Sequence, residues 1–188
     1  MTDSRLHLDR YDQSWFSRGR SNLVVVLWDL VQTFLIHPSP HPAYAWRRFW
    51  YRLFGAKLGH KVLIRKSVRC NYPWKVAIGD HSMIGDEAWL YALEHITIAD
   101  HVVISQQAYL CTGSHDITDP TFNLKVAPVT IQHGAWVALG ALIMPGVTIG
   151  AGAVVGARAI LTKDAVPWTV YVGQPAKPVG PRTLRELP

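Results

Sequence analysis

The sequence is poor in cysteine and has no apolar segment long enough to span a membrane. Only Cys70 and Cys111 occur among its 188 residues, so the dense disulfide framework of small secreted domains is excluded and a reducing compartment is the simpler expectation. Its apolar run at residues 23–36 covers fourteen residues, whereas a spanning helix needs about 20.

The chain also lacks a secretory signal and a uniform charge. Its first twenty residues carry no continuous apolar core after a basic start, so we expect a cytoplasmic protein. Residues 1–75 hold 13 Lys and Arg against 4 Asp and Glu, a net of +9, whereas the remainder holds 6 against 9, a net of −3. The second part is therefore not a polyanion binder, and no nucleic-acid partner is expected.

What the sequence does have is a six-residue repeat. An aliphatic residue followed by a small one recurs from the middle of the chain onward, as in Ile78-Gly79 and Ile84-Gly85. Grouped in threes, the aliphatic positions form triplets that each span eighteen residues. The triplets are Leu58/Ile64/Cys70, Ile78/Ile84/Leu90, Ile98/Ile104/Leu110, Ile131/Val137/Ile143 and Ile149/Val155/Leu161.

This period fits neither a helix of 3.6 residues per turn nor a simple alternating sheet. It fits short strands joined by tight turns around a prism, with one aliphatic side chain per hexad pointing inward. Five triplets predict about five stacked coils, each burying its inner row against its neighbours. After Leu110 the next inward aliphatic residue is Ile131, so a loop at about residues 115–128 leaves the stack, with His115 at its root.

The repeat resembles that of the hexapeptide-repeat acyltransferases over roughly residues 58–178. The resemblance is carried by the local sequences YPWKVAIGD, VVISQQAYLCTGSHD, PGVTIGAGAVVGARAILTKD and VGQPAKP. These look most like the O-acetyltransferases of colanic-acid biosynthesis, and are more distantly similar to the maltose, galactoside and nodulation acetyltransferases.

This resemblance implies an all-β protein, a left-handed parallel β-helix with an N-terminal helical extension. It also implies a homotrimer with active sites between subunits, no metal, and acetyl-CoA as co-substrate. The implied reaction is acetyl transfer to a saccharide hydroxyl in exopolysaccharide or surface-polysaccharide biosynthesis.

The histidine at the root of the loop is the candidate general base. Acyl transfer to a hydroxyl needs a group that takes the proton while oxygen attacks the thioester, and imidazole, with an intrinsic pKa of about 6.5, suits this role. In the resembled enzymes the histidine of the GSH sequence is that base, which carries over to His115. The alternative interpretation is a histidine that only forms a hydrogen bond at the loop root.

For the donor, the resemblance implies that acetyl-CoA lies in the groove between adjacent subunits. Six positions match cofactor-binding positions of the family. At the nucleotide end, a cation and a hydroxyl suit the phosphate groups. The six positions are Trp136, Leu139 and Ala157 for the pantetheine arm, and Thr162, Lys163 and Lys177 for the nucleotide. A match of Arg182 to a further arginine of the family is left open.

The acceptor side matches the family less well. The maltose and galactoside enzymes use an Asn and an Asp on coils beneath the histidine, and Gly85 and Leu93 occupy the matching positions here. The nearby candidates for binding the saccharide are Asp86, Glu87 and Tyr91, although a carboxylate at the corner of a hexad is ordinarily a turn residue.

We expect three parts in the chain, a helical extension at residues 1–57, the β-helix at 58–166 and a C-terminal tail at 167–188. The extension contains two expected helices, at residues 23–36 and 43–55. On the second helix one face is predicted to carry Trp46, Phe49, Trp50, Leu53 and Phe54, with Arg48 and Arg52 on another.

These helices have two interpretations. They either cap the open end of the β-helix or form an interfacial pair with aromatic residues and arginines at lipid headgroups. The second interpretation gives peripheral contact with the inner face of the membrane through residues 23–55, and a cap with a membrane-facing side satisfies both.

Two functions of other classes remain as alternatives. Some hexapeptide β-helices are zinc-dependent carbonic anhydrases, and His81 and His101 share one phase a coil apart. A zinc site needs at least three protein ligands, however, and no third is found at a suitable spacing. A purely structural β-helix would show the repeats but gives no reason for the loop, for His115 at its root or for the TKD and PAKP sequences.

Overall fold

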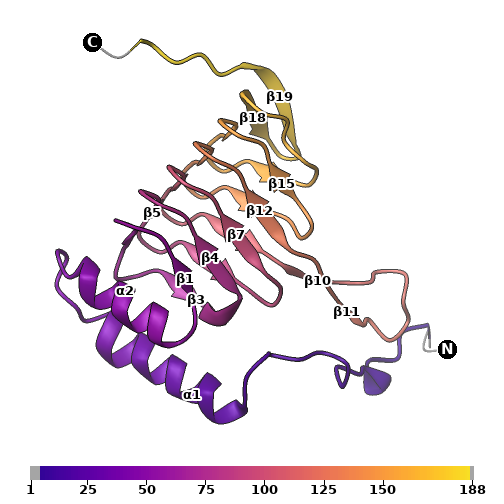
Figure 1. Ribbon diagram of the computed structural model, residues 1–188. Coiled ribbons are helices and arrows are strands. Elements are labelled where there is room, and N and C mark those ends of the chain that lie inside the picture. The colour runs from indigo at the N-terminus through magenta and orange to yellow at the C-terminus, as the bar shows by residue number, and fades with distance from the viewer. Residues whose placement is uncertain (1–4, 187–188) are drawn as a thin grey trace.

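Three sheets of short strands form the body of the molecule, and each coil of the chain adds one strand to each sheet (Figure 1). The computed structural model describes residues 5–186, so residues 1–4 and 187–188 of the predicted extension and tail lie outside it. The first sheet contains β1 (Lys57–Leu58), β4 (Val76–Ile78), β7 (Ile96–Ile98), β12 (Val129–Ile131) and β15 (Thr148–Ile149). The second contains β2 (Leu63–Ile64), β5 (Met83–Ile84), β8 (Val103–Ile104), β13 (Trp136–Val137), β16 (Val154–Val155), β18 (Thr169–Gly173) and β19 (Ala176–Pro181). The third contains β3 (Arg69–Cys70), β6 (Trp89–Tyr91), β9 (Tyr109–Cys111), β14 (Leu142–Ile143) and β17 (Ile160–Leu161).

The register of the strands confirms the predicted repeat. In the first sheet Leu58, Ile78 and Ile98 are aligned, as the triplets predict, and the same holds in the other two sheets. Every predicted inward residue after Leu58 is buried. Within residues 5–186 the stack has five complete coils, and β18 with the bridge between Ile149 and Ala165 begins a sixth. β18 lies in the segment expected as a C-terminal tail.

Close stacking of the coils explains why a small residue follows several of the inward ones, such as Ile78 and Ile84. A Cβ atom added to Gly85 would lie 2.7 Å from the backbone nitrogen of Gln106 in the next coil. At Gly79 it would lie 2.7 Å from the backbone nitrogen of Asp100. A side chain at these corners would therefore force neighbouring coils apart.

The N-terminal helices cover the open end of the first coil (Figure 1). They are α1 (Asn22–Val31), the π-helical turn η2 (Gln32–Ile36) and α2 (Tyr44–Leu53), while η1 (Leu8–Arg10) and η3 (Pro73–Lys75) are short 3-10 turns. Trp28, Ile36 and Tyr51 are fully buried in one core cluster with the coils. The capping interpretation is confirmed.

The cap also binds the backbone of the first coil, whose strands have no neighbouring coil on that side. Arg47 Nε donates to the carbonyl oxygen of Ile64 at 2.6 Å, and Arg48 donates to that of Val62 at 3.0 Å. Arg52 donates to carbonyl groups of the same coil. Edge carbonyls that would otherwise need water are thus satisfied by guanidinium groups.

The aromatic face of α2 is not the face that lies deepest against the coils. Its innermost residues are Arg47 and Tyr51, both fully buried, whereas Trp46, Phe49 and Leu53 are 42%, 54% and 61% exposed. Burying a charged group is costly unless it is paired by hydrogen bonds. The open coil edge supplies the partners, since its unpaired carbonyls need donors.

The predicted loop at residues 115–128 is an ordered arm. β10 (Gly113–His115) and β11 (Leu124–Val126) pair antiparallel and project from the stack (Figure 1). Near the tip, the carboxylates of Asp116 and Asp119 accept hydrogen bonds from backbone amides two residues on, which closes the turn. We refer to residues 113–126 as the arm.

Candidate active site

His115 lies on the arm, where its imidazole ring is held on two sides. Nδ1 lies 2.8 Å from the carbonyl oxygen of Phe122, and the two rings stack with centroids 4.3 Å apart and planes inclined by 11°. The ring of Tyr11 approaches with a centroid distance of 5.9 Å. A carbonyl oxygen can only accept, so Nδ1 carries the proton and Nε2 keeps its lone pair. The neutral ring can therefore accept a proton through Nε2.

A cavity of about 650 Å³ opens beside His115. It lies between the arm and the later coils, and it has both polar and apolar walls. Residues that line it include Trp15, Ser114, Lys125, Met144 and Thr162. Such a mixed lining is typical of sites for ligands that combine apolar and hydroxyl groups.

An ion pair joins the two sides of the arm just beyond the histidine. Lys125 Nζ lies 2.7 Å from Asp116 Oδ2, and Thr118 also donates to this carboxylate. The hydrogen bonds from Lys125 and Thr118 hold the pKa of Asp116 well below its usual range. Stability from a lowered pKa is lost only when the pH falls through the folded-state value, so Asp116 stays charged throughout the range in which imidazole titrates.

Three of the predicted cofactor residues come together in one place. Thr162, Lys163 and Lys177 line a second cavity of about 390 Å³ at the β18–β19 hairpin. Because Thr162 also lines the cavity of His115, the two cavities are adjacent. Arg182 lies apart from them, since it donates to the carbonyl oxygen of Gly134 at 2.8 Å.

The other three predicted cofactor residues lie on a different edge of the prism. Trp136 stands on β13 in the second sheet, with its Nε1 2.9 Å from Ser105 Oγ. Leu139 and Ala157 occupy the turns that lead from the second sheet to the third in successive coils. Within a single chain, and among residues 5–186, none of these three residues lines either of the two cavities named above.

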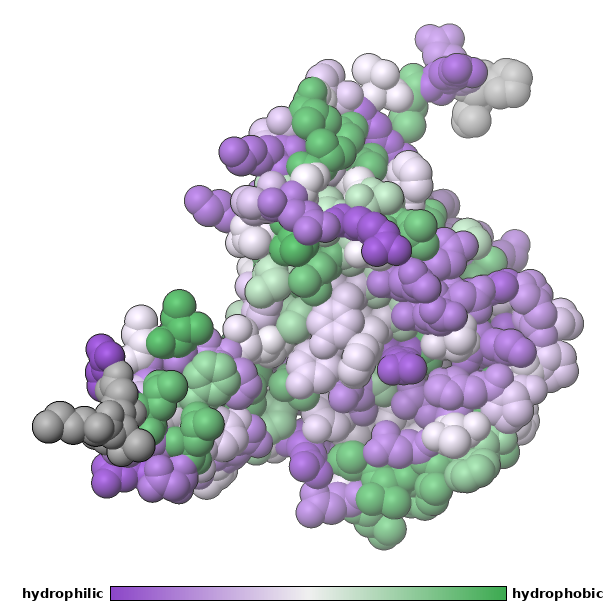
Figure 2. Space-filling view, turned by 180° about the vertical axis from the view of Figure 1, so that it is seen from behind, coloured by the Kyte–Doolittle hydropathy of each residue, from purple (hydrophilic) through white to green (hydrophobic). Residues whose placement is uncertain are grey.

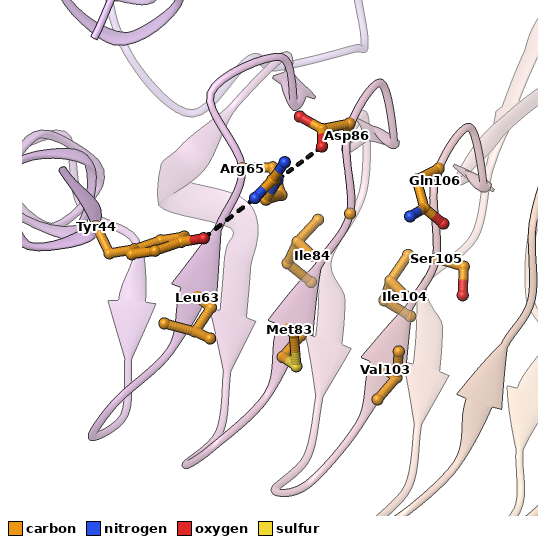
Figure 3. A pocket seen from close by; sticks show the side chains of 11 residues that line it. Tyr44, Leu63, Arg65, Met83, Ile84, Asp86, Val103, Ile104, Ser105 and Gln106 are labelled. Atoms are coloured by element: carbon orange, nitrogen blue, oxygen red, sulfur yellow. Dashed lines mark hydrogen bonds and ion pairs between the residues drawn. The ribbon is translucent and has the colours of Figure 1, made fainter. Parts of the chain in front are cut away.

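Asp86, an acceptor candidate, lies in a third cavity, of about 290 Å³ (Figure 3). Its carboxylate accepts hydrogen bonds from Arg65 at 2.6 Å and from Ser67 at 2.8 Å, and Arg65 also donates to Tyr44. Figure 3 shows this chain of contacts reaching from α2 to the coil corner. The carboxylate is thus committed to an ion pair within the chain.

The other two acceptor candidates have structural partners as well. Glu87 accepts a hydrogen bond from Gln107 at 2.9 Å. Tyr91 stacks on Tyr109 with centroids 5.9 Å apart and packs under the arm against Leu93. Within the described part of a single chain, neither Glu87 nor Tyr91 lines the cavity of His115.

The corner histidines form an exposed row along the stack. His81 and His101 stack with centroids 5.1 Å apart, and His60 and His133 continue the row at 5.8 Å and 5.2 Å. Within residues 5–186 no group of three or more His, Cys, Asp or Glu side chains is placed to hold a metal ion. The geometry therefore gives the zinc alternative no support.

Three N-terminal residues reach the arm and its cavity without any repeat or motif that predicts it. The backbone amide of His7 donates to the carbonyl oxygen of Pro120 at 2.7 Å, Tyr11 contacts His115, and Trp15 lines its cavity. The available signal was the concentration of aromatic residues at positions 11, 15 and 16 in an otherwise polar stretch.

Comparisons with curated proteins identify relatives. Over 128 residues the chain is 45% identical to an Escherichia coli (strain K12) protein named for acetyl transfer in colanic acid biosynthesis, with 68% of this chain and 70% of that protein covered. It is 33% identical over 124 residues to nodulation protein L of Rhizobium meliloti, covering 64% and 68% of the two chains. No family model matches the chain.

Solved structures share the architecture. A maltose O-acetyltransferase from Clostridium difficile superposes with a TM-score of 0.79 at 24% identity, covering 87% of this chain and 90% of that one, which shows likeness of fold. A hexapeptide-repeat acetyltransferase from Vibrio cholerae, complexed with acetyl coenzyme A, gives a TM-score of 0.78 at 27% identity, covering 86% and 88%. The aligned coils and the similarity to these relatives show that the chain belongs to the hexapeptide-repeat acetyltransferases and has their left-handed parallel β-helix.

Proposed function

We propose that the protein transfers the acetyl group of acetyl-CoA to a hydroxyl group of a saccharide, in the assembly of an exopolysaccharide or surface polysaccharide. The observation that carries this proposal is the orientation of His115, with Nδ1 fixed on a carbonyl oxygen beside a cavity of about 650 Å³. The names of the relatives support the acetyl donor and a saccharide product. Nε2 is then the atom that receives the acceptor's proton.

In this mechanism the imidazole of His115 works as a base and then as an acid. Nε2 takes the proton from the acceptor hydroxyl while the oxygen attacks the thioester carbonyl. The resulting tetrahedral intermediate collapses as the carbon–sulfur bond breaks, and the imidazolium returns its proton to the departing thiolate. Throughout, Nδ1 donates to the Phe122 carbonyl oxygen, which favours the positively charged ring and keeps it in place.

We assign the nucleotide end of the donor to the cavity at the β18–β19 hairpin. Lys163 and Lys177 are exposed there and offer two cations to phosphate groups, while Thr162 adds a hydroxyl. The adjacency of the two cavities lets one extended molecule reach from these lysines to His115. Donor binding and chemistry are therefore carried by different residues.

Replacing both Lys163 and Lys177 by alanine is expected to raise the KM for acetyl-CoA by about tenfold and to leave kcat within about twofold. Steady-state kinetics at varied acetyl-CoA concentration measure this. Lys66→Ala, which removes an exposed lysine at the other end of the stack, is the matched control and should change neither constant. An unchanged KM in the double variant would place the nucleotide elsewhere.

We infer a homotrimer with active sites between subunits. An exposed apolar row supports it, since Met83, Val103 and Trp136 stand side by side on the second sheet with 45%, 37% and 43% of their surface exposed. Figure 3 shows Met83 and Val103 of this row, with Leu63 preceding them on the same sheet. A second copy packed on this row would bring Trp136, and with it Leu139 and Ala157, toward the cavity of its neighbour.

We further propose that the outer side of the N-terminal helices lies against an anionic membrane, at its cytoplasmic face. Figure 2 shows apolar residues gathered at the lower edge of the molecule, over these helices. We call this surface the helical apolar face; it consists of Leu23, Val26, Leu27, Leu30, Phe34, Leu35, Trp46, Phe49 and Leu53. Across residues 5–186, neither helix has the length and apolar character that a bilayer crossing demands. Interfacial contact is the arrangement that such a face suits.

The protein is expected to co-sediment with anionic liposomes at low salt, and Phe49→Ser with Leu53→Ser should abolish most of that binding because both side chains are more than half exposed. Val179→Ser, which removes an exposed apolar side chain far from the helices, is the control. If the wild type fails to bind at low salt, or the double variant binds as well as the wild type, the membrane proposal is rejected and a soluble acceptor is favoured.

A further inference from the structure

A stretch of chain before the helices runs along the arm and brings one residue, Trp15, to the cavity of His115. We call residues 7–16 the N-terminal strap. Its first part follows the arm, where His7 donates to the carbonyl oxygen of Pro120 at 2.7 Å and the backbone amide of Asp12 lies 3.5 Å from Asn123 Oδ1. Figure 1 shows this segment running from α1 out to the arm. The strap therefore touches the same element that carries the catalytic histidine.

The other end of the strap is anchored on the coils. Phe16 packs against a buried cluster of Tyr72, Leu93 and Leu124, and Lys75 Nζ lies 5.0 Å from the centroid of the Phe16 ring. Just beyond the strap, Lys75 also donates to the carbonyl oxygen of Ser17 at 3.1 Å. The strap is thus anchored at both ends, on the arm and on the coils.

Trp15 stands between these anchors with its ring at the cavity. It lines the same cavity as Ser114 and His115, and 54% of its surface is exposed. The adjacent Phe16 meets its ring edge to face at 6.0 Å and is itself partly buried, which restricts the indole. An ordered indole held open at a cavity wall beside a base is a surface ready for a ligand.

The two positions matched to polar acceptor residues of the maltose and galactoside enzymes hold apolar or small residues here, and one of them, Leu93, lies under the strap. Of the two positions that sequence analysis matched to those residues, Gly85 cannot carry a side chain, because its Cβ would lie 2.7 Å from the next coil. Leu93 is only 8% exposed and belongs to the cluster that anchors Phe16. Leu93 therefore packs against the strap, and neither matched position offers a polar side chain to an acceptor.

We propose that Trp15 is the acceptor platform, on which the C–H face of a saccharide ring stacks while one hydroxyl group points to Nε2 of His115. This inference rests on the proposed function and names the group that holds its acceptor. The indole suits a pyranose because its electron-rich face attracts the partly positive C–H groups on one side of the ring. The donor residues Thr162, Lys163 and Lys177 lie on the later coils, so the strap side of the cavity is open to the acceptor.

The test compares Trp15→Ala and Trp15→Phe with wild type, using methyl glycosides of glucose, galactose and mannose as acceptors. Trp15→Ala is expected to raise the KM for the saccharide about tenfold, the equivalent of one stacking contact, with the KM for acetyl-CoA within about twofold. Trp15→Phe should restore most of the affinity. Trp168→Ala, which removes another exposed tryptophan, is the matched control and should leave both constants unchanged.

A binding measurement keeps this inference separate from the proposed reaction. Saturation-transfer NMR with the same methyl glycosides is expected to show a signal with wild type that is lost in Trp15→Ala. No signal with wild type, equal signals in both proteins, or an equal loss of acetyl-CoA affinity overturns the platform. Failure of the proposed function has a different result, since the glycosides would then bind through Trp15 without being acetylated.

Discussion

Replacing His115 by alanine is expected to lower turnover by about 100-fold or more while the coils stay folded. The side chain lies on the arm, outside the inward columns of the stack, so its removal deletes the proton acceptor without opening the core. The measurement is the rate of free CoA release with a saccharide acceptor, with circular dichroism to check the fold. Turnover close to that of wild type would exclude His115 as the base.

The matched control for this variant is His133→Ala, an exposed corner histidine that lies in the stacked row. It should retain full activity. The wild-type rate should also fall toward acidic pH, because a protonated imidazole cannot accept the hydroxyl proton. The lowered pKa of Asp116 keeps its carboxylate charged over this range, so its contact with Lys125 is not the cause of an acid-induced loss of rate.

Replacing Arg47 by alanine is expected to lower the free energy of unfolding by about 3 kcal/mol. The guanidinium group is fully buried and donates to the carbonyl of Ile64, to Ser39 Oγ at 2.9 Å and to the carbonyl of His41 at 2.8 Å. Its removal leaves buried acceptors without donors and opens a cavity under the cap. Urea denaturation at one fixed protein concentration measures the change.

Arg48→Ala provides the comparison on the same helix. Arg48 is partly buried and donates to the carbonyl of Val62, so its loss should cost about 1 kcal/mol. Equal losses in the two variants would show that the buried network around Arg47 does not hold the cap to the first coil.

The coils could be predicted because each hexad repeats one local requirement. Ile84 points inward and Gly85 gives room for the next coil, and this pair of demands recurs along the chain whatever the distant residues are. The position of His115 follows from the same regularity, since it marks the point where the inward column is interrupted. Its role as a base stays a prediction until it is tested.

The strap, the antiparallel pairing within the arm and the buried face of α2 could not be predicted in this way. Asp12 and Asn123 are 111 positions apart, and nothing in a local pattern indicates that they meet. Arg47 is buried because an open coil edge lies opposite it, which is a property of the assembled stack. Residues that satisfy a distant backbone have no periodicity of their own, so their functions are visible only in the folded chain.

The two ends of the stack have a consequence for how the chain associates. Parallel coils present complementary edges at top and bottom, so bare ends could add to one another head to tail without limit and form filaments. Here the first edge is covered by α1 and α2 with their arginines, and β19 runs antiparallel to β18 at the other end of the second sheet. End-to-end growth is therefore blocked, and copies of the chain are left to associate through their sides.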